Sequence, residues 1–194
     1  MPVLVQPSPA YRETFLQGAA EFAAEGRLDS TYAAFLGYDY NLLERDFSGF
    51  VEALLKLHDL DRLPAGWFPD RVLWLVEAEE YLGQASIRPE LGSMYLITYG
   101  GHIGYSIRPA RRRRGYGTAI LGLALEEARR MGLKRVLVTC DADNTASKKI
   151  IEANGGRFER SMDMDADIIK AEGRDPGAPL SKLRYWIPLA DGAA

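Results

Sequence analysis

The stretch Arg108–Thr118, RPARRRRGYGT, places four consecutive arginines directly before two glycines that flank a tyrosine. An extended apolar segment precedes it and an amphipathic helical pattern follows it, so it predicts a glycine-containing loop between a strand and a helix. The first turn of a helix has unpaired backbone amides, and the helix dipole favours negative charge there. Gly115 and Gly117 carry no side chain and permit backbone angles that other residues resist. The stretch therefore predicts a cradle for a phosphorylated ligand.

Two other interpretations of the arginine run stay open at this point. A run of like charges is most often a solvated face of a protein. A basic run can also bind nucleic acid, but no second basic cluster and no aromatic-interleaved basic surface accompanies this one. The glycine spacing matches neither the dinucleotide fingerprint G-x-G-x-x-G nor the phosphate-loop motif G-x-x-x-x-G-K-[ST].

The sequence on both sides of the cradle alternates between helix and strand patterns. Apolar residues at helical spacing predict helices near residues 11–26, 46–58, 118–131 and 144–154. Buried or alternating patterns predict strands at residues 71–78, 83–88, 100–109, 134–141, 157–163 and 183–189. Residues 91–99 fit either a short helix or an irregular connection, and residues 170–180 read as a polar loop. This order predicts an α/β (α+β) fold with a mixed sheet.

Length, charge and cysteine content limit the kind of protein. A chain of 194 residues predicts one domain, 1–194, with a helical part at residues 1–65. The net charge of −3 means that any attraction for phosphate must be local. The lone cysteine, Cys140, excludes an internal disulfide and a cysteine-rich metal site and fits a reducing compartment. The chain shows no signal-peptide pattern and no long apolar run, so we expect a cytoplasmic protein without a membrane partner.

Two motifs together resemble a known family. Residues Arg112–Gly117 match the [QR]-x-x-G-x-[GA] signature of the GNAT superfamily of acetyl-CoA-dependent N-acetyltransferases. Asn144, Ser147 and Gly155 follow the family pattern N-x-x-[AS] … G on the next unit. The segments GGHIGYSIRP and DNTASKKIIEANGG are similar to a group of bacterial predicted acetyltransferases whose substrates are mostly unassigned. The resemblance covers residues 72–189 and is weak over the first 65 residues.

The resemblance implies a fold and a place for the coenzyme. The GNAT fold has a mixed, mostly antiparallel central sheet that is splayed between strands four and five and flanked by helices. The pantetheine arm of acetyl-CoA would lie in this splay like an added strand. By similarity, backbone amides of the cradle would hold the pyrophosphate, and neighbouring residues would contact the arm. The implied coenzyme-binding residues are Ile107, Arg112, Arg113, Arg114, Gly115, Tyr116, Gly117, Thr118, Asn144 and Ser147. Asn144 also suits a plain helix N-cap.

The catalytic groups are harder to assign. The family often carries a tyrosine acid seven residues beyond the asparagine, and this chain has Ile151 there. His102, near the start of strand four, could carry protons, although a histidine beside two glycines is more often structural. Tyr105 on the same strand is the other catalytic candidate, with core packing as its alternative. Cys140 is expected to be a small buried residue.

Other polar and aromatic residues have simpler interpretations. Tyr185 and Trp186 fit either the acceptor site or the core, and His58 is expected to be structural. The two histidines stand in no ligand spacing with carboxylates, so no metal site is expected.

The function expected from the resemblance is transfer of the acetyl group of acetyl-CoA to a primary amine of a small molecule or peptide. The acceptor site is expected between the N-terminal helices, the loop before strand four and residues 175–180. Asp163, Asp165 and Asp167 either attract a cationic amine or form a solvated face. A non-catalytic acyl-CoA sensor is the main alternative. No nucleic-acid partner is expected, and a homodimer is left open.

Overall fold

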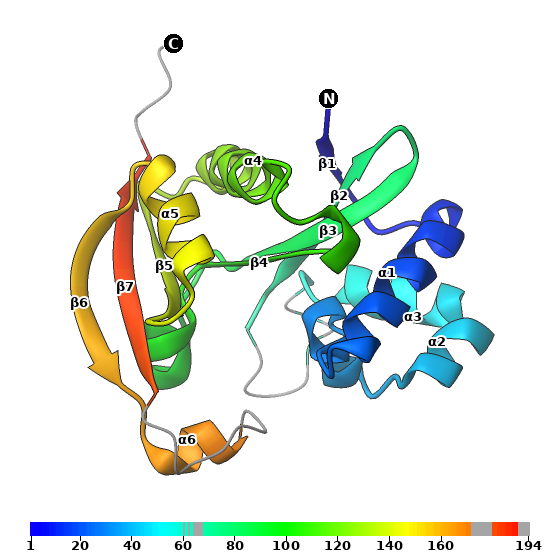
Figure 1. The fold of residues 1–194 in the computed structure, drawn as a ribbon, viewed down its shortest axis with the longest axis horizontal. Coiled ribbons are helices and arrows are strands. Elements are labelled where there is room, and N and C mark those ends of the chain that lie inside the picture. The colour runs from blue at the N-terminus through cyan, green and yellow to red at the C-terminus, as the bar shows by residue number, and fades with distance from the viewer. Residues whose placement is uncertain (60, 62, 64–67, 172–179, 190–194) are drawn as a thin grey trace.

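The computed structural model describes residues 1–59, 61, 63, 68–171 and 180–189, and it consists of two antiparallel sheets with helices packed around them (Figure 1). The first sheet has the order β1-β2-β3-β4 and the second the order β5-β7-β6. The strands of the first sheet are β1 (Val3–Val5), β2 (Arg71–Glu77), β3 (Glu80–Ile87) and β4 (Ile103–Ile107). Those of the second are β5 (Arg135–Asp141), β6 (Arg157–Asp163) and β7 (Ser181–Pro188). The predicted α+β class is confirmed, and every pairing between these strands is antiparallel.

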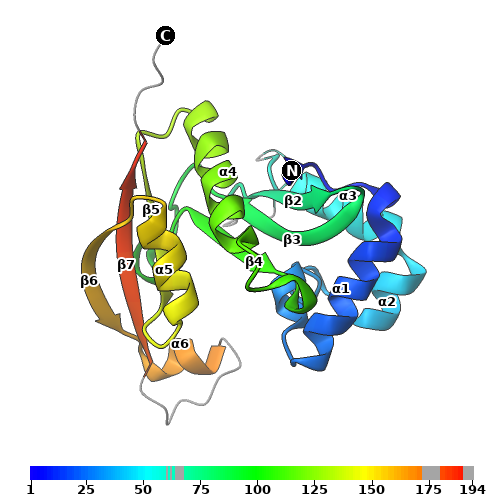
Figure 2. The same cartoon turned by 45° about the horizontal axis from the view of Figure 1, so that its top comes forward.

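The helices divide between the two faces of the first sheet. On one face lie α1 (Arg12–Ala24), α2 (Tyr40–Arg45) and α3 (Phe47–Lys56). On the other, α4 (Tyr116–Arg130) crosses the sheet and α5 (Thr145–Ala153) lies beside it (Figure 2). A short α6 (Ala166–Ala171) follows β6. None of the described helices is long and apolar enough to cross a membrane.

The strand β2 shows why the sheet is covered on both faces. Val72, Trp74 and Val76 belong to the core under α1 and α3, whereas Leu73 and Leu75 belong to the core under α4 and α5. Successive side chains of a strand point to opposite faces, so an unbroken apolar run fits a strand buried on both sides. The ring of Phe15 in α1 stacks on Trp74 with the centroids 4.7 Å apart.

The strands β4 and β5 meet at one end and then part, as the resemblance to the GNAT fold implies. An isolated bridge joins Gly101 to Val138, and the His102 amide donates to the Leu137 carbonyl at 2.8 Å. Gly101 has φ +80°, and a Cβ there would lie 2.6 Å from the Leu137 carbonyl oxygen. Beyond this junction β4 pairs only with β3 among the described strands. The edge of β4 that faces β5 is therefore open for an added strand.

Several short elements are not apparent from the sequence. The strand β1 and the helices α2 and α6 have three or six residues each, too few for a clear periodic pattern. Residues 91–99, predicted as either a short helix or an irregular connection, run into a π-helical turn, Leu96–Gly100. Helix α4 begins at Tyr116, two residues before the predicted start, so Gly117 lies in its first turn. Of the predicted polar loop at 170–180, residues 172–179 lie outside the described residues.

Candidate functional site: an amide cradle at the mouth of a splayed sheet

The loop before α4 presents a row of unpaired backbone amides. Arg113 (φ +60°) and Gly115 (φ +84°) are both left-handed, with Arg114 between them. This alternation turns successive amides toward one side, a geometry that binds anions. Within the described part of the chain, no backbone amide from Arg113 to Thr118 donates a hydrogen bond, and the first helical bond is Ala119 N to Gly115 O at 3.1 Å. The cradle, residues 113–118, thus combines a nest of amides with the positive end of α4.

The two glycine positions of the cradle favour glycine for different structural reasons. A Cβ at Gly115 would meet no atom within 4 Å, so only its left-handed φ favours glycine. A Cβ at Gly117 would lie 2.5 Å from the Ile150 Cδ1 of α5. Gly117 was expected to make room for a diphosphate, but the group nearest to its missing side chain is Ile150. Because Gly117 has no side chain, α4 and α5 can approach each other closely.

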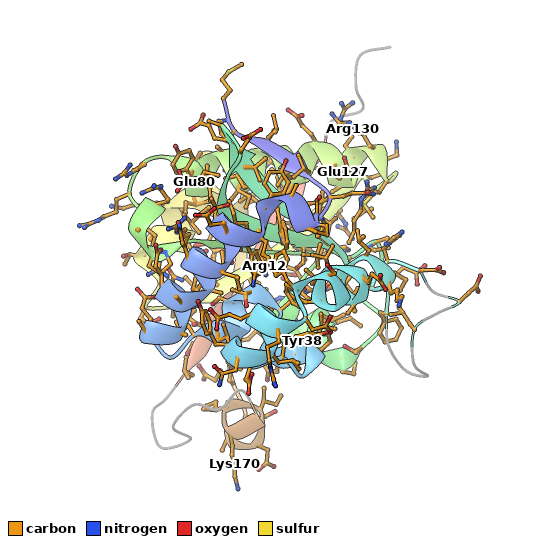
Figure 3. The ribbon with its side chains drawn as sticks, turned by 90° about the vertical axis from the view of Figure 1, so that its right-hand side faces the viewer. Arg12, Tyr38, Glu80, Glu127, Arg130 and Lys170 are labelled. Carbon is orange, nitrogen blue, oxygen red and sulfur yellow. The ribbon has the colours of Figure 1, made fainter. Side chains whose placement is uncertain are left out.

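Arg108, which opens the run, is buried and structural. It is 6% exposed and pairs with Glu21 of α1 at 2.7 Å and with Glu80 of β3 at 3.1 Å. Glu80 is labelled in Figure 3, at the side of the first sheet nearest α1. Arg108 also donates to the Gln17 amide oxygen at 3.3 Å. The ion pairs hold the pKa of Glu21 below its ordinary value, although burial opposes them.

Arg111 and Arg112 also form ion pairs with acidic residues. Arg111 pairs with Glu80 at 2.6 Å, so its side chain does more than face solvent. Arg112 binds both carboxylate oxygens of Glu25 at 2.8 and 2.9 Å, a bidentate geometry. Its Nε donates to the Ile107 carbonyl at 3.1 Å, and its guanidinium lies over the Phe22 ring. Arg112 therefore ties α1 to the strand that leads into the cradle.

Arg113 and Arg114 differ from the other arginines of the run. Both are exposed, and neither forms an ion pair with any described residue. Of the five cations in residues 108–114, these two remain for a ligand. Sequence reasoning could not separate them from the rest, because the acidic partners lie in α1, at its C-cap and at the start of β3, far away in the sequence.

Tyr116 points away from the cradle. Its hydroxyl donates to the Glu77 carboxylate of β2 at 2.7 Å, which raises the pKa of Tyr116 and lowers that of Glu77. The side chain therefore anchors the start of α4 to the first sheet. The structure therefore shows Tyr116, one of the implied coenzyme-binding residues, in contact with Glu77 of the first sheet.

Tyr105 of β4, Ser147 of α5 and Cys140 of β5 lie together beyond the junction, where β4 and β5 belong to different sheets; the region around these three residues is called the slot. The Tyr105 hydroxyl lies 2.7 Å from the Ser147 Oγ. Burial raises the pKa of Tyr105 to about 12 and that of Cys140 to about 11. Asn144 caps α5, because its Oδ1 accepts the Ser147 amide at 3.0 Å. The predicted N-cap is confirmed, and it puts Ser147 in the first turn of α5.

The side chain of His102 forms a hydrogen bond at the junction of β4 and β5. Its Nδ1 accepts the Leu137 amide at 2.9 Å, and its ring lies 6.1 Å from that of Trp186. Burial lowers the pKa of His102 below 6.5. A proton-carrying role would require this nitrogen to give up its backbone donor, so the role stays a prediction.

Ile151 is fully buried in the core between the sheets and α4, which leaves no polar group at the position of the family's tyrosine acid. Tyr185 is also buried, with its hydroxyl 3.4 Å from Glu152.

Among the described residues, no three His, Cys, Asp or Glu side chains are grouped so as to hold a metal ion.

A pocket of about 410 Å³ lies elsewhere, between β1, β2 and the second half of α4. Glu127 and Arg130 on its rim are labelled in Figure 3. Glu127 pairs with Arg71 at 2.7 Å and with Arg130 at 3.0 Å, and Arg130 also lies 3.7 Å from Glu126, so the two cations and two carboxylates of the rim neutralise one another. The cradle and the slot are not part of this pocket.

Comparison with known proteins agrees with this geometry. The family model of the acetyltransferase (GNAT) domain matches residues 44–157, more than half of the chain. No curated protein matches the sequence. Similar solved structures include the microcin C7 self-immunity acetyltransferase MccE with acetyl-CoA and AMP, at 17% identity and a TM-score of 0.64 over 96% of this chain and 92% of that one.

Two further structures, both from Salmonella typhimurium, are similar at 17% identity. yncA, solved with acetyl-CoA, has a TM-score of 0.56 over 100% of this chain and 96% of its own. The enzyme that modifies the N-terminal serine of ribosomal protein L7/L12 has a TM-score of 0.60 over 96% and 94%. At this identity the likeness shows a shared fold.

Proposed function

Because this chain belongs to the GNAT acetyltransferase family, we propose that it transfers the acetyl group of acetyl-CoA directly to a primary amine. The observation that carries the proposal is the cradle, whose six consecutive amides from Arg113 to Thr118 lack partners within the described residues. Such a row at a helix N-terminus suits the pyrophosphate of the coenzyme. Arg113 and Arg114 add two uncompensated positive charges beside it.

The pantetheine arm would continue from the cradle into the slot. The open edge of β4 offers backbone groups to an added strand. Asn144 and Ser147 would meet the arm from the first turn of α5, and Ile107 would meet it from the end of β4. The structures of MccE and yncA, which share this fold, were solved with acetyl-CoA.

The acceptor would approach from the face that carries α1 and the turn before β4. A buried network lies behind the turn before β4: Asp70 binds both the Tyr32 hydroxyl and the Arg88 guanidinium, and Arg88 donates to the Gly101 carbonyl at 3.3 Å. The other oxygen of Asp70 is buried without a hydrogen-bond partner in the described structure. A relative that modifies the N-terminal serine of a ribosomal protein supports amines of peptides as one class of acceptor.

The cradle is tested by calorimetry with acetyl-CoA. Replacing both Arg113 and Arg114 by Gln should weaken binding about tenfold or more, because charge-assisted hydrogen bonds to phosphate are lost. The thermal unfolding midpoint should change little, since neither side chain forms an ion pair within the described structure. Arg112→Gln is the matched control: it should lower the unfolding midpoint through the loss of the pair with Glu25, while its effect on affinity stays smaller.

The results separate the proposal from its alternatives. Wild-type protein that does not bind acetyl-CoA would overturn it, as would equal affinities for the wild type and the Arg113/Arg114 double variant. Tight binding without release of free thiol across a broad panel of amines would favour the non-catalytic sensor, an alternative supported by the buried Ile151. A DNA-binding role would instead show strongly salt-dependent affinity for DNA.

A further inference from the structure

The pocket between β1, β2 and the second half of α4 is a site that the proposed function does not use. Its volume of about 410 Å³ lies within the range of cavities that bind small molecules. The cradle lies at the first turn of α4, whereas the pocket lies along its last turns. An α-helix rises about 1.5 Å per residue, so Tyr116 and Glu126 lie about 15 Å apart along α4. The pocket is therefore distinct from the anion site at the cradle.

The walls of the pocket are aliphatic. They include Leu4 of β1, Leu73 of β2 and Leu123 of α4. Leu73 belongs to the core under α4, and Leu4 and Leu123 pack against that core, so the walls are held in place. Walls of this kind favour an aliphatic group on the ligand.

The rim of the pocket is charged but neutral as a whole. Its two cations are Arg71 and Arg130, and its two carboxylates are Glu126 and Glu127. Glu127 pairs with Arg71 through one oxygen and with Arg130 through the other. Because the four charges balance, the rim favours neither a simple anion nor a simple cation. It suits a ligand that carries one charge of each sign.

Two groups of the rim retain capacity for such a ligand. Within the described residues, the Arg71 guanidinium is paired only through Nη1, which leaves the donors on Nη2 and Nε. In the same part of the chain, Glu126 pairs only with Arg130, at 3.7 Å, and its side chain is 59% exposed. Arg71 can therefore donate to a carboxylate, and Glu126 can accept from an ammonium group.

We propose that this pocket binds a free α-amino acid with an aliphatic side chain. The carboxylate of the ligand binds Arg71, and its ammonium group binds Glu126. The aliphatic side chain packs against Leu4, Leu73 and Leu123. Binding is non-covalent and needs neither acetyl-CoA nor the slot, so this inference does not depend on the proposed function.

Saturation-transfer NMR of the full chain with L-leucine tests the proposal. L-Leucine should bind with a dissociation constant of about 1 mM or lower. Three analogues test the parts of the ligand separately: isocaproate lacks the ammonium group, isoamylamine lacks the carboxylate, and glycine lacks the side chain. Each should bind at least about fivefold more weakly than leucine.

Two variants of the rim identify the site. Glu126→Gln and Arg71→Gln should each weaken leucine binding about fivefold or more. Glu126→Gln should not weaken the binding of isocaproate, which has no ammonium group to lose a partner. The thermal unfolding midpoint should change little, because Glu127 keeps its pair with Arg130 in both variants. Arg129→Gln is the matched control and should bind leucine like the wild type, since Arg129 is exposed on α4 but does not line the pocket.

The possible results separate this site from the rest of the molecule. Absence of leucine binding at about 20 mM would overturn the proposal. Equal binding by the wild type and both rim variants would also overturn it, because leucine would then bind elsewhere, for example in the slot. An analogue that binds as tightly as leucine would contradict the class of ligand. A protein that binds leucine in this pocket but does not bind acetyl-CoA would contradict the proposed function alone.

Discussion

The imidazole of His102 accepts the Leu137 amide on Nδ1, so the neutral ring carries its proton on Nε2. A general base must have a free lone pair, and in this ring the lone pair is already bound to the backbone. The structure therefore explains His102 as part of the junction between β4 and β5. In the sequence, the adjacent glycines signal a special backbone, but they do not reveal which ring nitrogen is used.

The pH dependence of His102 follows from its lowered pKa. The unfolded chain has a His pKa near 6.5 and the folded chain a lower one. Above pH 6.5 the ring is neutral in both states, so the native state has its full stability. As the pH falls below 6.5, the unfolded state binds a proton first, and the free energy of unfolding should decrease.

NMR titration of the His102 ring protons checks this. A His102 midpoint at or above 6.5 would contradict the burial of the neutral ring. His102→Gln should flatten the dependence of stability on pH in this range.

At the scale of elements, the contact between α4 and α5 depends on Gly117. A Cβ there would lie 2.5 Å from Ile150 Cδ1, the far end of a flexible side chain. Gly117→Ala should lower the free energy of unfolding by about 1 kcal/mol, because the Ile150 side chain must leave its preferred rotamer or the helices must move slightly apart. Adding Ile150→Val, which removes that methyl group, should recover part of the loss.

Chemical denaturation of the two single variants and the double variant checks this coupling. Purely additive effects would mean that Ile150 does not limit the approach of the helices. Gly115→Ala is the matched comparison, because it meets no atom and only the left-handed φ resists it. If Gly117→Ala weakens acetyl-CoA binding without a loss of stability, the glycine serves the ligand directly.

The elements that the sequence predicts are those with strong periodicity. Helices α1, α3, α4 and α5, together with the strands of the two sheets after residue 70, lie close to the predicted ranges. The amphipathic patterns, the N-cap Asn144 and the closing glycines carry that information locally. The sequence does not predict which arginines form ion pairs, because Glu21, Glu25 and Glu80 approach them only in the folded chain. The pairing of Tyr105 with Ser147 likewise depends on how β4 and α5 are placed across the slot.

Across the whole molecule, one junction joins the two sheets at the closed end of the slot. Gly101 bridges to Val138 with φ +80°, and its missing Cβ faces a backbone oxygen that cannot move aside easily. Gly101→Ala should therefore cost about 2 kcal/mol of stability. It should also weaken acetyl-CoA binding, because the angle between β4 and β5 sets the width of the slot.

Gly104→Ala on the same strand is the control. A Cβ there would lie 3.1 Å from the Ser86 hydroxyl, a side chain that can rotate. Denaturation and calorimetry of both variants check the expectation. If Gly101→Ala lowers stability but binds the coenzyme as tightly as the wild type, the junction does not control the width of the slot.

The ion pairs of the arginine run have a consequence for how this protein can change over evolutionary time. Arg112 is held by Glu25, the C-cap residue of α1, which is remote from the cradle in the sequence. A substitution that removes the Glu25 carboxylate would release a third cation at the edge of the amide nest, without altering any residue of the nest itself. The positive charge of Arg112 is therefore available only when its pair with Glu25 is lost. The affinity of the anion site can change through mutations outside its own sequence motif.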